Sequence, residues 1–150
     1  MNASSRYTVA LHVLTLLAHD GEEALTSEFI AGSVDTNPVV IRRVLAALRD
    51  AKLVTSQPGP GGGWLLLRSA KGITLRDVYR AVEADPLFGL HSGTPNPRCP
   101  VGGRIQALLL RRYEEARLAL EKDLERTTIE DLCKGVRAGA VDRSGHSHKT

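Results

Sequence analysis

The chain has 150 residues, of which 42% are hydrophobic and 25% charged, a composition typical of one globular domain with an extension. Two cysteines are too few for a disulfide framework, and no secretory leader or bilayer-length apolar stretch is evident, so we expect a soluble cytoplasmic protein without a membrane partner. The net charge of +3 is unevenly distributed, because residues 20–35 hold five acids and no Lys or Arg, whereas residues 38–68 hold five bases against one acid. This basic segment favours an anionic partner such as nucleic acid.

Apolar residues at helical spacing predict an amphipathic helix over residues 7–19, ended by the Asp-Gly pair at 20–21. Ser27 can cap a short second helix, which is expected to break at residues 32–33. A third helix should begin at the Asn-Pro pair at 37–38, because Asn is a preferred N-cap residue and Pro is tolerated at the first helical position. The residues that this third helix should bury are Ile41, Val44, Leu45 and Leu48.

Two short strands, residues 53–57 and 64–68, flank a turn with four glycines and two prolines, which predicts a hairpin with a long tip. A phosphate-binding loop is excluded here, because no Gly-Lys-Ser/Thr follows and the turn leads into a strand. Two short helices followed by a hairpin predict a winged helix-turn-helix, in a fold that is mainly α with a small β-hairpin wing.

A capping box at Thr74 and Asp77 predicts a helix through Glu83. We therefore divide the chain into a winged helix-turn-helix domain (1–84), an effector or sensor loop (85–103), a long dimerisation helix with a short C-terminal helix (104–134) and a disordered tail (135–150). The residues expected to line the dimer interface are Ile105, Leu109, Tyr113, Ala116 and Leu120.

The third helix and the hairpin tip are the candidate readers of double-stranded DNA. Arginine can pair with guanine or a phosphate, valine can touch a thymine methyl group, and glycine lets the backbone approach the sugar-phosphate chain closely. The alternative is a solvated helix face followed by an ordinary flexible turn. The candidate DNA-binding residues are Asn37, Val39, Val40, Arg42, Arg43, Arg49, Pro60, Gly61 and Gly62.

The segments NPVVIRR (37–43), LRDAKLV (48–54), GPGGGW (59–64) and ITLRDVYRAVE (73–83) resemble the Rrf2 family of winged-helix transcriptional regulators. The resemblance implies a homodimer that binds an operator and usually represses transcription. Two-fold symmetry then predicts a palindromic operator, and no convincing catalytic set of residues points to an enzyme. Well-known members hold a [2Fe-2S] cluster on three cysteines of the loop before the dimer helix. This loop holds only Cys99, and the nearby His91 does not replace two thiolates, so we expect no iron–sulfur cofactor.

Cys99 lies just before the long helix, where the helix dipole, Arg98 and Arg104 should lower the pKa of its thiol. One hypothesis is a redox or thiol-reactive sensor, and the other is a small buried residue that closes the loop. A second hypothesis is that the loop docks a protein partner, as in one family member, or a small ligand. A thiol peroxidase is a third alternative. Side chains expected to have structural or solvating roles are Cys133, His12, His19, Glu114, Glu115 and Glu121.

Overall fold

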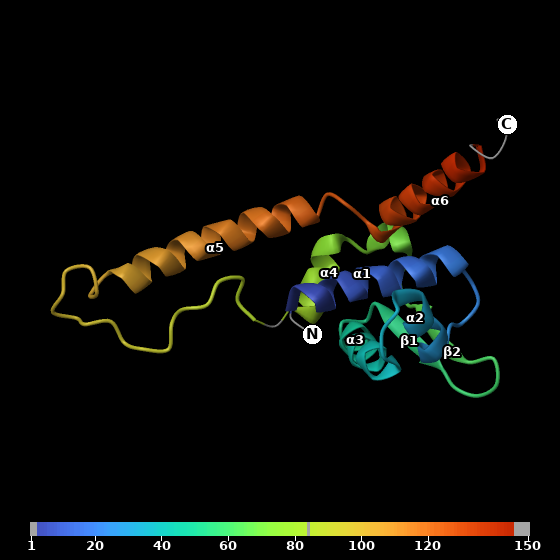
Figure 1. Cartoon of the computed structure of the whole chain (residues 1–150), viewed down its shortest axis with the longest axis horizontal. Coiled ribbons are helices and arrows are strands. Elements are labelled where there is room, and N and C mark those ends of the chain that lie inside the picture. The colour runs from blue at the N-terminus through green and yellow to red at the C-terminus, as the bar shows by residue number, and fades with distance from the viewer. Residues whose placement is uncertain (1–2, 84, 146–150) are drawn as a thin grey trace.

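The computed structural model describes residues 3–83 and 85–145, and within them it shows a mainly helical fold with one two-stranded antiparallel sheet (Figure 1). None of the helices in this part of the chain is long and apolar enough to cross a membrane. The predicted fold class, mainly α with a small hairpin, is confirmed. The elements in chain order are α1 (Ala3–Asp20), α2 (Ser27–Val34), α3 (Pro38–Asp50), β1 (Val54–Gln57), β2 (Gly63–Leu66), the 3₁₀ turn η1 (Ala70–Gly72), α4 (Leu75–Val82), α5 (Ile105–Leu124) and α6 (Ile129–Gly145).

Helix α1 is the centre of the hydrophobic core and packs against α2, α3, α4 and α6. Full burial of a Val, Leu or Ile side chain stabilises a fold by about 1.5–3 kcal/mol, so this face of α1 supplies much of the driving force. The predicted apolar face of α3 is fully buried against it. The buried core residues of α1 and α3 are Ala10, Val13, Leu14, Leu17, Ile41, Val44, Leu45 and Leu48.

The caps of α2 and α3 fix the helix-turn-helix geometry. As predicted, α3 begins after Asn37, whose side-chain oxygen accepts a hydrogen bond from the amide of Val39 at 2.8 Å. The prediction for α2 was wrong at both ends. Thr26 caps α2 by accepting from an amide of its first turn, and the helix continues through residues 32–33 until Asp35 ends it in the left-handed conformation with φ of 62°.

The hairpin is tied to the rest of the domain through Leu25. Val54 pairs with Leu66, and the register continues to the pair Gln57 and Gly63, so both strands are shorter than predicted. The amide of Leu25 donates to the carbonyl of Trp64 at 3.0 Å, and the Trp64 amide donates back at 2.8 Å. Only glycine fits at position 63, because φ is 147° and an added Cβ would lie 2.5 Å from the Leu25 carbonyl oxygen.

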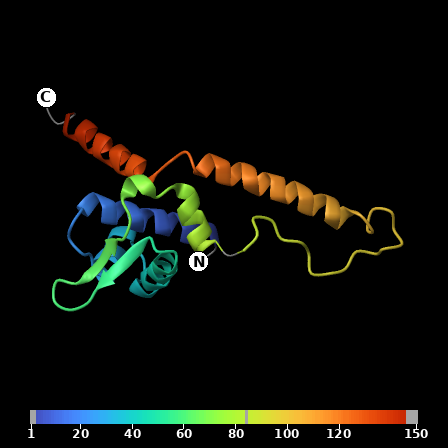
Figure 2. The same ribbon diagram turned by 180° about the vertical axis from the view of Figure 1, so that it is seen from behind.

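Helix α5 projects away from this body, and the loop of residues 85–104 runs beside it (Figures 1 and 2). The ring of Phe88 in the loop lies 5.1 Å from the ring of Tyr113 on α5, centroid to centroid. Beyond α5 the chain returns to the body, where the amide of Ile129 donates to the carbonyl of Ile73 at 2.9 Å. Cys133 on α6 is buried, as expected for a structural residue, and its thiol donates to the Thr15 carbonyl of α1 at 3.5 Å.

The expectation of a disordered tail from residue 135 was wrong for residues 135–145, which belong to α6. The helix starts from a reciprocal cap, in which the Asp131 amide donates to the Thr128 hydroxyl and the Thr128 amide donates to the Asp131 carboxylate. An ion pair of 3.5 Å between Arg137 and Glu130, which lie two turns apart, further stabilises α6. Anchoring on α1 outweighs the poor helix propensity of its glycines. Residues 146–150 of the expected tail lie outside the described residues.

Candidate nucleic-acid interface

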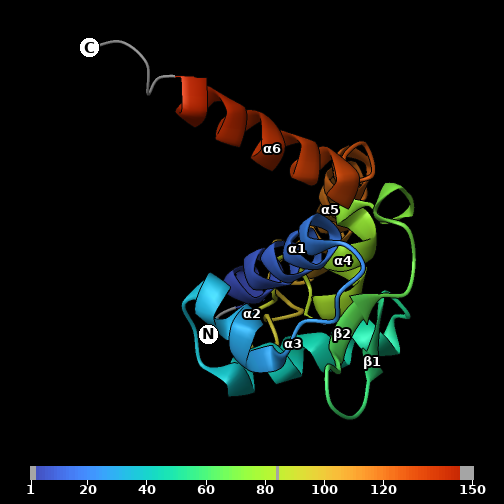
Figure 3. The same ribbon diagram turned by 90° about the vertical axis from the view of Figure 1, so that its right-hand side faces the viewer.

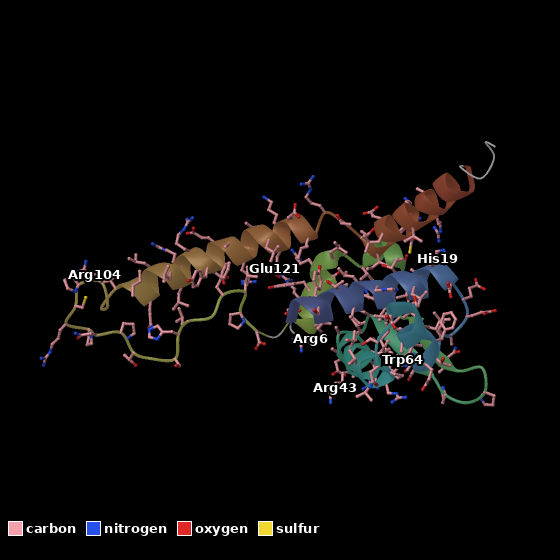
Figure 4. The ribbon with its side chains drawn as sticks, in the orientation of Figure 1. Arg6, His19, Arg43, Trp64, Arg104 and Glu121 are labelled. Carbon is pink, nitrogen blue, oxygen red and sulfur yellow. The ribbon has the colours of Figure 1, made fainter. Side chains whose placement is uncertain are left out.

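Helix α3 and the hairpin tip lie together on the lower side of the body in Figure 1, on the side opposite α6. Most of the predicted DNA-binding residues therefore share one surface. In Figure 4 the side chain of Arg43 points away from the body on this side, and Trp64 belongs to β2, one pair in from the hairpin tip.

The two arginines in the first turns of α3 differ in their surroundings. Arg43 is exposed, and no ion pair of its side chain is found among the described residues. The side chain of Arg42 is 54% exposed and donates to the carboxylate of Glu28 on α2 at 2.9 Å. Hydrogen bonds from the backbone amide of Glu28 and from Arg42 lower the pKa of the Glu28 carboxyl group. Sequence reasoning missed this pair, because nothing local indicates which acid of α2 faces which base of α3.

The remaining candidates at the start of α3 have unequal access to a ligand. The side-chain oxygen of Asn37 is engaged in capping the helix, as described above, which leaves its amide nitrogen for other partners. Val39 is exposed and Val40 is half-buried. Val39 and Arg43 stand one turn apart on the helix, so an apolar and a cationic group are presented together.

Arg49 connects α3 to the hairpin. Its guanidinium lies 6.0 Å from the centre of the Trp64 ring, a cation–π distance, while its side chain remains about half exposed. This contact fixes the hairpin relative to α3. The sequence indicated the charge of Arg49 but not its aromatic partner.

The hairpin tip is a tight turn. Pro60 and Gly61 are exposed, whereas Gly62 is half-buried and its amide donates to the carbonyl of Gly59 at 2.9 Å. A Cβ at Gly62 would lie 2.2 Å from the carbonyl oxygen of Gln57, so the turn has no room for a side chain. The Gly62 amide is therefore used inside the turn, and Pro60 and Gly61 form the surface that a ligand can meet.

The residues predicted for the dimer interface do not share one environment. Part of that stripe faces the chain's own loop, because Phe88 packs against Tyr113. Ile105, Leu109, Tyr113 and Leu120 are half-buried, while Ala116 is exposed. Sequence reasoning missed a second set of apolar side chains on α5, each more than half exposed, at Leu108, Leu110 and Leu118.

Glu121 on α5 was expected to lie on a solvated face, and this expectation was wrong. Its side chain is only 3% exposed and accepts a hydrogen bond from Arg80 of α4 at 2.5 Å. Arg117 also donates to it from the preceding turn. Glu114 and Glu115 do lie outside and pair with arginines three residues away. Glu121 is buried because α4 packs against its side of α5.

Cys99 is exposed in the turn before α5, so it is not a small buried residue. Hydrogen bonds from the amides of Gly102 and then Val101 lower the pKa of its thiol. The direction agrees with the prediction, and the donors are backbone amides of the turn before α5, whereas the flanking arginines do not contribute. The amide of Gly103 donates to the Cys99 carbonyl at 2.9 Å and holds that turn closed.

Comparison with known proteins agrees with this geometry. Residues 3–135 match the model of the Rrf2 family, described as an iron-dependent transcriptional regulator. YwnA of Bacillus subtilis, named as an HTH-type transcriptional regulator, is 42% identical over 86% of this chain and 95% of its own. The HTH-type transcriptional regulator IscR of Cereibacter sphaeroides is 29% identical over 89% of this chain and 86% of its own.

Among solved structures, the oxidised form of CymR from Staphylococcus aureus superposes with a TM-score of 0.63 and 25% identity, covering 89% of this chain and 96% of that one. The relatives are named as transcriptional regulators and not as enzymes, which argues against the peroxidase alternative. The match to the family model and the shared winged-helix architecture together show that this chain belongs to the Rrf2 family of transcriptional regulators.

Proposed function

We propose that this transcriptional regulator is a homodimeric repressor that binds duplex DNA through α3 and the hairpin tip, and that the thiol of Cys99 controls its binding. The observation that carries the proposal is the single surface formed by Arg43, Val39, Arg42 and the exposed tip at residues 60–61. A helix placed in the major groove presents its first turns to base edges, and a hairpin beside it reaches the neighbouring backbone.

The exposed apolar side chains of α5 support dimerisation. A helix that projects from the core with leucines more than half exposed leaves apolar surface in water, which is unfavourable for a monomer. A second copy that packs along α5 would cover this surface. Two-fold symmetry then places two α3 helices about 34 Å apart, one turn of DNA, and predicts a palindromic site.

Exposure and a lowered pKa support a sensing role for Cys99, because the thiolate is the nucleophilic form of cysteine. With hydrogen peroxide, the thiolate would attack one oxygen, form a sulfenic acid and release hydroxide. A related protein, CymR of S. aureus, has been crystallised in an oxidised form. Cys99 lies in the loop that packs on α5, so its modification would change the surface available for dimerisation.

The residues of this chain do not fit an iron–sulfur cluster, although the family description names iron. A cluster of this kind needs about four thiolate or imidazole ligands, and the loop offers Cys99 alone. Cys133 is buried against α1, and the ring of His91 accepts a hydrogen bond from the amide of Gly93 in an exposed turn. We therefore propose that this regulator works without a cluster.

A second candidate keeps the DNA-binding surface and gives the loop a docking role. Leu87, Phe88 and Leu90 are each 41–50% exposed on the loop, where a partner protein or a small ligand could cover them. Replacing Cys99 with Ser separates the two candidates, because docking should survive this change and thiol sensing should not.

The experiment that tests the proposal selects duplexes from a random pool with the full chain, reduced or treated with peroxide. We expect a palindromic sequence with half-sites about one turn apart, bound by reduced protein in a salt-dependent manner and released on oxidation. Cys99→Ser should bind under both conditions. A monomer in sedimentation equilibrium, or affinity that does not depend on salt, would contradict the proposal.

A further inference from the structure

A cavity of about 770 Å³, open to solvent, lies along α1 between α2 and α6. Figure 3 shows α6 above α1 and α2 below it, and residues of all three helices line the site. This volume falls within the range of small-molecule sites in proteins, roughly 300–1,000 Å³. The lining residues used below are Phe29 and Ser33 of α2, His12 and His19 of α1, and Gly135 and Val136 of α6.

The centre of the cavity is apolar. Leu11, Leu16 and Leu132 line it together with Phe29, which is 55% exposed, and Val136, which is 49% exposed. The hydroxyl of the lining residue Thr15 donates to the Leu11 carbonyl at 2.7 Å and is therefore already engaged within α1. Large apolar side chains around a concave surface favour an apolar molecule that removes them from water.

Polar groups lie at two positions on the α1 wall, seven residues apart, which is about 10 Å along a helix. At the first, His12 Nε2 is 3.0 Å from the Ser33 hydroxyl of α2. At the second, His19 Nδ1 is 3.1 Å from a carboxylate oxygen of Asp20 (Figure 4 labels His19). Nδ1 is engaged by this carboxylate, and Nε2, the other ring nitrogen, has no hydrogen-bond partner among the described residues. A hydroxyl group on a ligand would satisfy this nitrogen in any protonation state, because a hydroxyl both donates and accepts hydrogen bonds.

Gly135 keeps the α6 side of the cavity open. An added Cβ at this position would meet no atom within 4 Å, although the residue lines the cavity. Glycine inside a helix is less stable than alanine, and here it leaves space where any other residue would place a side chain. A larger side chain at position 135 would therefore occupy the cavity without displacing the backbone.

We propose that the cavity between α1, α2 and α6 binds a small, mainly apolar molecule that carries a hydroxyl group, such as a phenol or an aromatic alcohol. The apolar centre would hold the body of the ligand, and Nε2 of His19 would form a hydrogen bond with its hydroxyl group. A second copy of the chain is the less favoured occupant, because the exposed leucines of α5 lie on the arm of the molecule that projects away from α6 (Figure 1).

Occupancy of this cavity is linked to the rest of the molecule through two of its walls. Helix α2 contacts α3 and holds Arg42 through Glu28, while α6 follows α5 in the chain. A ligand between α2 and α6 would change the position of α3 relative to α5, and so its affinity for DNA. This effect on DNA rests on the proposed function, whereas binding of the ligand does not.

The test measures displacement of the dye 1-anilinonaphthalene-8-sulfonate from the full chain by 2-naphthol, with 2-methylnaphthalene as the matched compound without a hydroxyl. We expect one naphthol site per chain in the wild type. Gly135→Leu should weaken naphthol binding at least tenfold, because it fills the cavity. Gly139→Leu is the control, since a Cβ there also meets nothing within 4 Å and the residue does not line the cavity.

Two further variants make the test independent of the folding of Gly135→Leu. Phe29→Ala removes an exposed wall and should weaken naphthol binding several-fold, whereas Leu67→Ala, which removes a side chain 53% exposed outside the cavity, should not. His19→Leu should reduce the preference for naphthol over methylnaphthalene about threefold to tenfold, the range expected for one hydrogen bond.

Equal naphthol affinity in the wild type, Gly135→Leu and Phe29→Ala would overturn the proposal. A change of oligomeric mass in Gly135→Leu, measured by sedimentation, would also overturn it by showing that a second copy covers the cavity. An unchanged preference in His19→Leu would overturn the assignment of the hydroxyl partner. If the chain binds naphthol but no DNA duplex, the ligand site is supported and only the proposed function is contradicted.

Discussion

Nε of Arg80 on α4 donates to Glu121 on α5 at 2.5 Å, and this contact attaches the projecting helix to the DNA-binding body. Arg117 donates to the same carboxylate, and Arg117 is itself held by Glu114 on the exposed side of α5. Burying the carboxylate of Glu121 is favourable only when the guanidinium groups of Arg80 and Arg117 are both in place. The contact therefore fixes the direction in which α5 leaves the body.

We expect Glu121→Gln to lower the free energy of unfolding by about 1–2 kcal/mol, because the amide loses its charge while Arg80 stays partly solvated. Urea denaturation at fixed chain concentration measures the change. Glu115→Gln is the matched control, since its partner Arg112 is exposed on the same helix, and it should cost less than about 0.5 kcal/mol. Equal losses in both variants would show that Glu121 is not the attachment point.

Arg43→Ala should weaken binding to the selected duplex and reduce the slope of log affinity against log salt by about one unit, because one phosphate contact is lost. Fluorescence anisotropy at several salt concentrations measures both quantities. Arg137→Ala provides the control, since this arginine is about half exposed on α6 and pairs with Glu130 away from α3. If Arg43→Ala leaves the slope of log affinity against log salt at the wild-type value, the DNA binds to another surface of the protein.

Glu28→Gln should tighten binding to the same duplex by a few-fold, in the direction opposite to Arg43→Ala. The change removes a negative charge that holds Arg42 at 2.9 Å and competes with phosphate for it. The gain should shrink as salt is added, since both groups are exposed. Loss of affinity would mean instead that Glu28 orients Arg42 for binding, a result that Arg42→Ala in the same assay would confirm.

Cys99 should react with iodoacetamide at a rate that increases with pH and then levels off. We expect this plateau at a lower pH in the protein than in a peptide spanning residues 96–103. Because the pKa of Cys99 is lowered, a larger fraction of Cys99 than of the cysteine in the peptide is in the reactive thiolate form until both are fully ionised. Cys133 should react slowly throughout, because burial raises the pKa of its thiol. Mass spectrometry resolves the two sites, and coincident curves for Cys99 and the peptide would remove the basis for sensing.

Local signals in the sequence predicted the elements that carry the candidate site. The Asn-Pro pair at 37–38 and the capping box at Thr74 and Asp77 act within one helical turn, so they could be recognised without knowledge of the fold. The glycine-rich turn predicted the hairpin for the same reason. The end of α6 was missed, because its helicity depends on packing against α1 and not on its own glycine-rich sequence.

The sequence by itself therefore determined the order of the helices, the hairpin, the basic surface of α3 and the family, all of which depend on residues close together in the chain. Only the tertiary structure decided that Glu28 holds Arg42, that Glu121 is buried against α4, and that α1, α2 and α6 line one open cavity. These features join residues 14 to more than 100 positions apart. A pattern of charge or hydrophobicity gives the face on which each side chain lies, but not the partner that the fold brings to it.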